Sequence, residues 1–340
     1  MGYSENSISN TFSKISTDEE MSIFRASLED AAKRLADGAG QGSISNEEIG
    51  KNDMLLETYR VASDAIHGGM GSVWQVRHTG WGVDLAMKRP QPRFFAEGSR
   101  ERRENFIAEC EHWIDLGLHP NIVSCYYVRE IGGVPTIFSE WMDGGSLKDR
   151  IRDGSLYTGT EQEVRERILD IAIQAARGLR YSHEQKLLHQ DMKPGNLLLT
   201  KDWEAKIADF GLAKAQQQLE DRGRALSSGG TAAYSPREQL EGAPAARWMD
   251  VYAWALTVLR MYAGEQLWET GGEARGRFAE TADRCRIPLS CRMRQLLAAC
   301  LTERPDGFDG ICGTLSVIWQ EETGAAYPRP EPDQIGRAHV

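Results

Sequence analysis

The sequence has few cysteines, and their spacing does not fit a metal site. The 340 residues contain six cysteines, none of them in a C-x-x-C pair, and no histidine lies at zinc-ligand spacing from them. Several lie in apolar runs such as LLAACL, which predicts buried, reduced thiols. Because such thiols persist in a reducing compartment, we expect a cytoplasmic location. The six are Cys110, Cys125, Cys285, Cys291, Cys300 and Cys312.

Long apolar runs and an excess of basic residues are also missing. No stretch approaches the roughly 18 consecutive apolar residues of a membrane helix, and the polar N-terminus lacks the apolar core of a secretory signal. We therefore expect no membrane insertion. The formal net charge of −10 disfavours nucleic acid as the main partner, because phosphate-binding surfaces need excess lysine and arginine. Hydrophobic residues make up 41%, enough for one large domain or two small ones.

Residues 1–57 are polar and are expected to form an N-terminal extension that is partly disordered. Within it, the spacing of apolar residues predicts one helix over 18–37. Thr17 and Glu20 match a capping box, and Gly38 is a plausible stop. This helix either packs loosely on the neighbouring domain or docks on a partner, so the sequence leaves the oligomeric state open.

The pattern changes near residue 58, where short β-type runs separated by glycine turns begin. One helical stretch, ENFIAECEHWIDLG, interrupts them, and the chain after GGSLKDRI is mostly helical. These features predict an α+β protein with two lobes, a small antiparallel β lobe over 58–142 and a larger helical lobe over 143–319. The Pro-rich end, 320–340, is expected to be disordered.

A glycine-containing loop, IHGGMGSVW, joins the first predicted strands. Gly68, Gly71 and Val73 match the later positions of G-x-G-x-x-G-x-V, whereas Ile66 replaces the first glycine. Glycines let backbone N–H groups approach phosphates without a Cβ in the way. A dinucleotide-binding motif would need a helix directly afterwards, but SVWQV is typical of a strand.

Lys88 lies at the end of the strand DLAMK, which follows the glycine loop at the distance expected for a paired strand. It could reach phosphate oxygens beneath the loop if a carboxylate held it. The helix FIAECEHWI offers Glu109 and Glu111, which cannot both face inward. Phe106, Glu109 and Trp113 share a face by their spacing, so Glu109 is favoured.

The stretch LLHQDMKPGNLLL places charged groups between two apolar runs, where they need a chemical reason. Asp191, Lys193 and Asn196 lie within one turn, and Asp209 follows on the next predicted strand.

These motifs together resemble a eukaryotic-type (Hanks-type) serine/threonine protein kinase. HQDMKPGN is similar to the catalytic loop H-R-D-x-K-x-x-N, and DFG, HPNIV, the hinge SEWMDGGSL and GTAAYSPREQL occur in the family's order. Asp250 matches the buried aspartate of the large lobe, and Arg304 matches the arginine that pairs with a glutamate, here Glu238. The resemblance covers residues from about Tyr59 to about Trp319.

The resemblance implies that the chain transfers the γ-phosphate of ATP to Ser or Thr hydroxyls of protein substrates. Asp191 would accept the hydroxyl proton, and Lys193 would neutralise charge near the γ-phosphate. A lysine two residues after the catalytic aspartate, here Lys193, also resembles the serine/threonine branch of the family rather than the tyrosine kinases. Asn196 and Asp209 would hold Mg²⁺, with Mn²⁺ a possible substitute.

The remaining implied contacts concern the nucleotide. Lys88, held by Glu109, would bind the α- and β-phosphates, under a loop formed by Ile66, Gly68 and Gly71. The other expected nucleotide contacts are the adenine sandwich Val73, Ala86 and Leu198 and the hinge backbone at Glu140 and Met142.

Four departures from the family pattern stand out. Gln190 replaces the arginine of H-R-D, making this a non-RD variant whose catalytic loop offers no charge to an activation-loop phosphate. We therefore expect that Ser227, Ser228 and Thr231 are not needed as phosphates. Ile66 could weaken ATP binding, Ser139 is a small gatekeeper, and PRE replaces A-P-E.

Two alternatives remain open at the level of sequence. A pseudokinase would use the fold as a nucleotide-binding or scaffold module, and the altered glycine loop is its main support. A small-molecule kinase of similar shape is disfavoured by GTAAYSPREQL, which is typical of peptide-substrate platforms.

Overall fold

The computed structural model describes residues 48–68, 71–95, 100–210 and 232–331. The helix expected over 18–37 and the residues Ser227, Ser228 and Thr231 lie outside the described residues. The described residues divide into two compact units, the first comprising 48–68, 71–95, 126–141 and 329–331 and the second comprising 100–125, 142–210 and 232–328.

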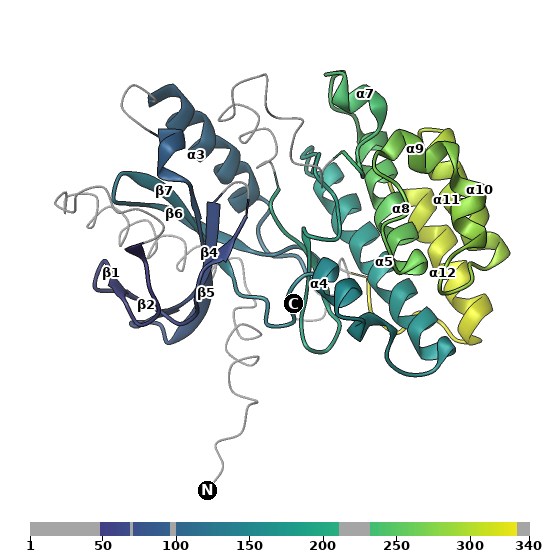
Figure 1. Ribbon diagram of the computed structural model, residues 1–340, viewed down its shortest axis with the longest axis horizontal. Helices are drawn as coiled ribbons and strands as arrows, with labels where there is room; N and C mark the ends of the chain where they lie inside the picture. Colours follow the sequence, from purple (N-terminus) through teal and green to yellow (C-terminus); the bar gives the residue numbers. More distant parts are fainter. Residues whose placement is uncertain (1–47, 69–70, 96–99, 211–231, 332–340) are drawn as a thin grey trace, which may run out of the picture. The chain divides into compact units, whose positions relative to one another are not determined.

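The first unit contains a seven-stranded sheet (Figure 1) with the order β1-β2-β4-β5-β7-β6, in which β3 also pairs with β4. The assigned pairings from β1 to β7 are antiparallel. A two-residue loop joins β6 to β7, and both of its glycines have positive φ, as a type I′ turn requires. The strands are β1 Met54–Leu55, β2 Tyr59–Val61, β3 Ile66–His67, β4 Gly71–His78, β5 Val83–Pro90, β6 Cys125–Ile131 and β7 Val134–Glu140.

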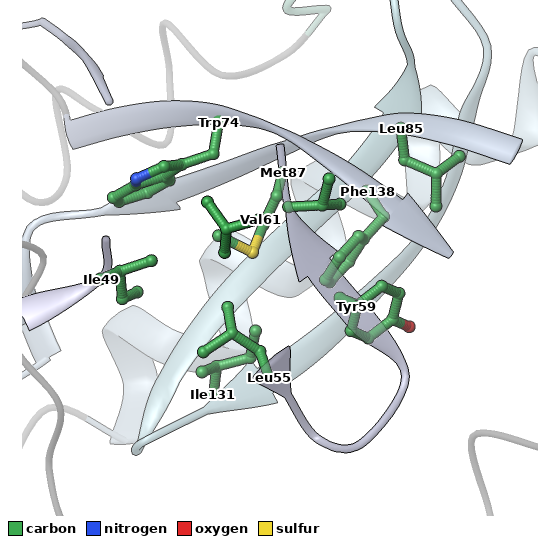
Figure 2. Close-up of a cluster of buried hydrophobic side chains, with 10 residues drawn as sticks. Ile49, Leu55, Tyr59, Val61, Trp74, Leu85, Met87, Ile131 and Phe138 are labelled. Carbon is green, nitrogen blue, oxygen red and sulfur yellow. The ribbon is translucent and has the colours of Figure 1, made fainter. Parts of the chain in front are cut away.

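Strict alternation along β4 and β5 gives the sheet two different faces. In β4, Trp74 and Val76 are buried and Val73 is half-buried; in β5, Leu85 and Met87 are buried. Because successive side chains in a strand point to opposite faces, the buried set shares one side. Figure 2 shows this core cluster, which consists of Ile49, Leu55, Tyr59, Val61, Trp74, Val76, Leu85, Met87, Ile131 and Phe138.

The folded part begins earlier than the sequence predicted. Ile49 and Leu55, which were assigned to an extension ending at residue 57, are 5% and 6% exposed and belong to the core cluster. Met54 and Leu55 also pair with β2 as a strand. The polar composition of this stretch concealed two apolar residues that are sufficient to anchor it.

The second unit is mainly helical. The 24-residue helix α5 begins with a capping box formed by Thr160 and Glu163, and both α8 and α12 pack against it. The predicted α5 stripe of Val164, Ile168, Ile171, Ala175 and Leu179 is buried throughout. The elements of this unit are α3 Arg100–Asp115, α4 Leu147–Arg152, α5 Glu161–Glu184, β8 Leu197–Leu199, β9 Ala205–Ile207, α7 Arg237–Leu240, α8 Arg247–Ala263, α9 Gly271–Gly276, α10 Phe278–Asp283, α11 Cys291–Thr302 and α12 Asp309–Thr323.

The helix α3 groups with the second unit, although it precedes the boundary predicted at residue 142. Its C-terminal end accounts for this grouping. The Trp113 indole donates to the carbonyl of Val123 at 2.9 Å, and the Tyr181 hydroxyl on α5 donates to the carbonyl of Leu116 at 2.9 Å.

The end of the chain is ordered farther than expected. A disordered tail from residue 320 was predicted, but α12 continues to Thr323 and Tyr327 packs against α5. The Tyr327 hydroxyl lies 2.5 Å from Asp170 Oδ1, and the Arg177 guanidinium lies 4.7 Å from the ring centroid. A charge-assisted hydrogen bond and a cation–π contact at one aromatic residue outweigh the Pro-rich composition around it.

All six cysteines are thiols, and four of them are buried. Burial raises the pKa of Cys300 to about 12 and that of Cys285 to about 11, so neither is a thiolate near neutral pH. Within the described residues, no helix combines the length and apolar character needed to cross a bilayer.

Candidate active site

The catalytic-loop candidate lies directly before the β8–β9 hairpin and is organised around the Asp191 carboxylate. Lys193 Nζ lies 2.6 Å from Asp191 Oδ2, and Asn196 Nδ2 donates to the same oxygen at 2.9 Å. Asn196 Nδ2 also donates to the Asp191 carbonyl at 2.8 Å. The structure therefore brings three of the predicted catalytic residues into direct contact through one carboxylate oxygen.

The other carboxylate oxygen of Asp191 is different. Oδ1 is buried and has no hydrogen-bond partner within the part of the chain that the structure describes. The side chain as a whole is 13% exposed. Because buried polar atoms are normally satisfied, an acceptor left over at this position fits a donor supplied by another molecule, such as a hydroxyl.

A buried aspartate on α8 holds the backbone that leads into Asp191. Asp250, 1% exposed, accepts hydrogen bonds from the backbone N–H groups of His189 at 2.8 Å and Gln190 at 2.7 Å. His183 Nε2 lies 2.8 Å from the same carboxylate. Gln190 has a φ of +63°, a conformation that costs an L-residue about 1–3 kcal/mol unless its surroundings hold it. Asp250 supplies that restraint.

His189 is a structural centre that the sequence reasoning did not assign. Its Nε2 lies 2.9 Å from the carbonyl of Ala208, and its Nδ1 lies 3.2 Å from the Asp191 backbone N–H. These partners fix the neutral tautomer with the proton on Nε2, since a carbonyl accepts and an N–H donates. The ring also packs edge-on against Phe210, with centroids 4.7 Å apart. The signal available in the sequence was a histidine directly after an apolar run, and the structure buries it fully.

Asp209 follows the hairpin at a position set by strand register. Leu197 pairs with Ile207, and Ala208 N–H donates to the Asn196 carbonyl at 2.8 Å. Asp209 is the next residue and has a φ of +68°. The hairpin therefore brings Asp209, twelve or more positions later in sequence, to the end of the chain segment that carries Asn196.

The donor atoms at this end of the hairpin suit Mg²⁺. Because Asn196 Nδ2 is engaged with Asp191, the amide oxygen is the atom that Asn196 can offer a cation, and Asp209 offers carboxylate oxygens. Mg²⁺ prefers oxygen ligands and commonly uses one or two protein side chains together with substrate phosphates. Among the described residues, no group of three or more His, Cys, Asp or Glu side chains forms a separate metal site.

In the first unit, the predicted nucleotide residues share the face of the sheet that points away from the core cluster. Val73 is the register partner of Lys88, and Ala86 is the partner of Ser139. Directly paired residues point to the same side, and Ala86 and Lys88 are two apart in β5. The sheet thus brings Val73, Ala86, Lys88 and the predicted gatekeeper Ser139 together on one face.

The two described glycines of the loop, Gly68 and Gly71, differ in how much room a side chain would have. A Cβ on Gly71 would lie 2.1 Å from the Arg89 carbonyl oxygen, so β4 and β5 can approach only because Gly71 has none. A Cβ on Gly68 would meet its nearest atom at 3.8 Å. Ile66 pairs with Val73 and so lies on the same face of the sheet, 61% exposed.

Glu109 is the buried carboxylate of the two that α3 offers. It is 8% exposed, between Phe106 at 1% and Trp113 at 2%, whereas Glu111 is exposed. The predicted inward face of the helix is therefore the observed one. Lys88 belongs to the first unit and Glu109 to the second, so their pairing stays a prediction.

The hinge and adenine residues are distributed over both units. Glu140 ends β7, Met142 is the first residue of the second unit after the hinge, and Leu198 is the half-buried middle residue of β8. Their common role around an adenine ring also stays a prediction.

The end of the activation segment is anchored within the second unit. Arg304 forms the predicted ion pair with Glu238, and its guanidinium lies 4.6 Å from the ring centroid of Trp248. The Trp268 indole donates to the Ala233 carbonyl at 2.8 Å. These contacts fix the segment that leads into α7.

Comparisons with known proteins agree with this fold. A family model described as "Protein kinase domain" matches residues 64–306, which is more than half of the chain. PknA of Corynebacterium glutamicum, a serine/threonine-protein kinase, is 31% identical over 235 residues that cover 66% of this chain and 47% of that protein. PknJ of Mycobacterium tuberculosis, another serine/threonine-protein kinase, is 31% identical over 227 residues, covering 64% of this chain and 36% of that protein.

Solved structures show the same fold. The crystal structure of the Mycobacterium tuberculosis PknI kinase domain aligns with a TM-score of 0.55 and 24% identity, covering 81% of this chain and 99% of that one. The fold and the site therefore define an α+β, two-lobed protein kinase. This chain belongs to the protein kinase family, and its domain is of the Hanks-type serine/threonine class. It spans about half or less of the length of these curated relatives.

Proposed function

We propose that the chain is an active protein kinase that transfers the γ-phosphate of ATP to Ser and Thr hydroxyls of protein substrates. The observation that carries this proposal is the state of Asp191. One of its carboxylate oxygens is held by Lys193 and Asn196, and the other is a buried acceptor with no partner among the described residues. This is the arrangement that a base needs before a substrate hydroxyl arrives.

The mechanism follows from these contacts. The substrate hydroxyl would donate to Asp191 Oδ1, which would orient the oxygen toward the γ-phosphorus and take its proton as the new P–O bond forms. The bond between the γ-phosphorus and the β,γ-bridging oxygen would break in the same step, and ADP would leave. Lys193, which already touches the other oxygen, places a positive charge beside the transferring group. Since the transition state of phosphoryl transfer is loose, positioning and charge neutralisation account for most of the rate enhancement.

Protein kinases generally use ATP with Mg²⁺, and the donor atoms of this site fit the cation. Asn196 and Asp209 would hold it, with Mn²⁺ an acceptable substitute because it also prefers oxygen ligands. The ion would neutralise phosphate charge. The chain's own contribution is the hydrogen bond from Asn196 to Asp191, which keeps the amide oxygen directed away from the carboxylate.

The nucleotide is proposed to bind along the outward face of the first unit's sheet. Lys88, paired with Glu109, would bind the α- and β-phosphates, and Val73, Ala86 and Leu198 would enclose the adenine. The hinge backbone at Glu140 and Met142 would hydrogen-bond the base. Ile66, Gly68 and Gly71 would cover the phosphates, although Gly71 is also required for strand packing.

The pseudokinase alternative has no specific observation in its favour beyond Ile66. The partners that we propose are protein substrates and ATP, with neither nucleic acid nor a membrane as a binding surface. The thiol state of all six cysteines supports a reducing, cytoplasmic setting.

The test is incubation of the chain with radiolabelled ATP, Mg²⁺ and a generic basic protein, followed by phosphoamino-acid analysis. We expect label on Ser and Thr, and its loss in Asp191→Asn. If the wild-type chain binds Mg-ATP but transfers no phosphate to any substrate, the pseudokinase alternative is correct instead.

A further inference from the structure

The peptide group between Gln190 and Asp191 is held at both of its ends. Its N–H, on Asp191, points at His189 Nδ1, 3.2 Å away. Its carbonyl oxygen, on Gln190, accepts a hydrogen bond of 2.6 Å from Gln239 Nε2. The plane of this peptide sets the direction in which the Asp191 side chain leaves the backbone, so both contacts act on the placement of the carboxylate.

Gln239 is well placed to transmit order from the activation segment to this peptide. It lies on α7, immediately after Glu238, whose ion pair with Arg304 anchors the helix (Figure 1). The hydrogen bond crosses 49 positions of sequence, from the end of the activation segment to the catalytic loop. Both residues belong to the second unit.

We propose that Gln239 is a positioning residue for phosphoryl transfer, which couples the substrate-side end of the activation segment to the Asp191 carboxylate by a neutral hydrogen bond. The inference rests on the proposed kinase activity and deepens it. An arginine at position 190 would link the catalytic loop to the activation segment only when that segment carries a phosphate. The hydrogen bond from Gln239 to the Gln190 carbonyl joins the catalytic loop to α7 without a phosphate.

The Gln239 hydrogen bond is expected to affect the placement of the Asp191 carboxylate rather than the affinity for Mg-ATP. Gln190 has a positive φ, and Asp250 restrains only its N–H side. Without the Gln239 contact, the peptide is held only through its N–H by His189, so its plane is less tightly fixed and Asp191 Oδ1 spends less time where a hydroxyl can reach it. The effect should therefore fall on kcat, while binding of Mg-ATP, which uses other residues, is unchanged.

Three substitutions separate the hydrogen bond from the shape of the side chain. Gln239→Met keeps the length and removes the donor, Gln239→Glu replaces the donor by an acceptor, and Gln239→Lys restores a donor. The matched control is Glu241→Gln, an exposed position just after the same short helix. All are made in the full chain after phosphatase treatment, and kcat, the KM for Mg-ATP and thermal unfolding are measured.

We expect Gln239→Met and Gln239→Glu to lower kcat by roughly three- to tenfold, the range of one neutral hydrogen bond, with KM for Mg-ATP unchanged. Gln239→Lys should stay within about twofold of wild type, as should Glu241→Gln. If Gln239→Met fails to fold, the Lys and Glu variants give the same decision, because they differ in the donor.

Wild-type rates in Gln239→Met or Gln239→Glu, or equal losses in the Lys and Glu variants, overturn the inference. A change confined to KM for Mg-ATP also overturns it. An inactive wild-type chain is a different result, since it refutes the proposed kinase activity itself.

Discussion

The catalytic loop and the glycine loop are built by different means. In the second unit, Asp191 is positioned by hydrogen bonds that involve the side chains of Asp250 on α8 and of His189 and Asn196 in the catalytic loop itself. In the first unit, the described residues on either side of the glycine loop are held by the pairing of β3 with β4 and by the hydrogen bond from the Gly68 N–H to the Gly71 carbonyl, and Ile66 is largely exposed. The placement of the proposed catalytic residue Asp191 therefore depends on a few buried polar contacts, whereas the sheet face proposed to bind the nucleotide depends on strand alternation.

The difference extends to backbone conformation. Gln190 and Asp209 both have positive φ, which surrounding contacts must offset at about 1–3 kcal/mol each. Gly68 and Gly71 have no positive φ, and the demand on Gly71 is purely one of space. Substitutions in the two regions should therefore fail in different ways.

The largest effect on stability is expected for Asp250→Ala. Two backbone N–H groups and His183 lose their shared acceptor, so the free energy of unfolding should fall by about 3 kcal/mol or more. Misplacement of Asp191 should also lower kcat by about 100-fold or more. Urea unfolding and steady-state kinetics test both. Asp202→Ala, at an exposed turn, is the control and should change stability by less than about 0.5 kcal/mol. Equal behaviour of the two variants would refute the role of Asp250.

Alanine substitutions at Gly68 and Gly71 should show whether each glycine is required because a Cβ would clash or because its backbone is flexible. Gly71→Ala places a Cβ against the Arg89 carbonyl oxygen, so we expect a loss of about 1–3 kcal/mol in unfolding free energy. Gly68→Ala meets only ordinary contacts and should cost less than about 1 kcal/mol. Thermal unfolding of both variants is the measurement. A larger loss at Gly68 would contradict the strand-packing role of Gly71.

Ile66→Gly restores the missing first glycine of the loop and tests whether the Ile66 side chain weakens nucleotide binding. Because a loop without this side chain can approach phosphates more closely, we expect the KM for Mg-ATP to fall by about two- to fivefold, less than 1 kcal/mol of binding. The value of kcat should not change. An unchanged KM would show that Ile66 does not weaken nucleotide binding, and a higher KM would show that Ile66 contributes to it.

The smallest effect is expected for the double variant Ser227→Ala and Ser228→Ala. The catalytic loop offers no arginine at Gln190 to bind a phosphate, so kcat should stay within about twofold of wild type. The control is phosphatase treatment of the wild-type chain, which should also leave kcat unchanged. Loss of turnover in the double variant would mean that another cation replaces the missing arginine.

Sequence patterns predicted the parts of the fold that repeat. The α5 stripe of Val164 through Leu179 followed from helical spacing, and the shared face of Val73, Ala86 and Lys88 agrees with strand alternation. The ordered motifs also predicted that Lys193 and Asn196 lie close to Asp191, and both contact its carboxylate.

Isolated anchors were not predictable. Ile49 and Tyr327 fix polar or Pro-rich segments through single side chains, and no periodicity marks such residues. The contact between Gln239 and Gln190 depends on a short helix and the catalytic loop meeting in the fold, which no local pattern encodes. Local sequence thus indicates elements, motifs and the partners of Asp191 within its own loop, while the distant partners Asp250 and Gln239 come from tertiary structure.

The most direct test is the single-turnover rate of phosphoryl transfer at saturating Mg-ATP and protein substrate, for wild type and Asp191→Asn. An asparagine keeps the shape of the side chain but cannot accept the proton, so we predict a rate lower by about 10²- to 10⁴-fold with unchanged nucleotide binding. Equal rates in the two proteins would contradict the claim that the Asp191 carboxylate is the base.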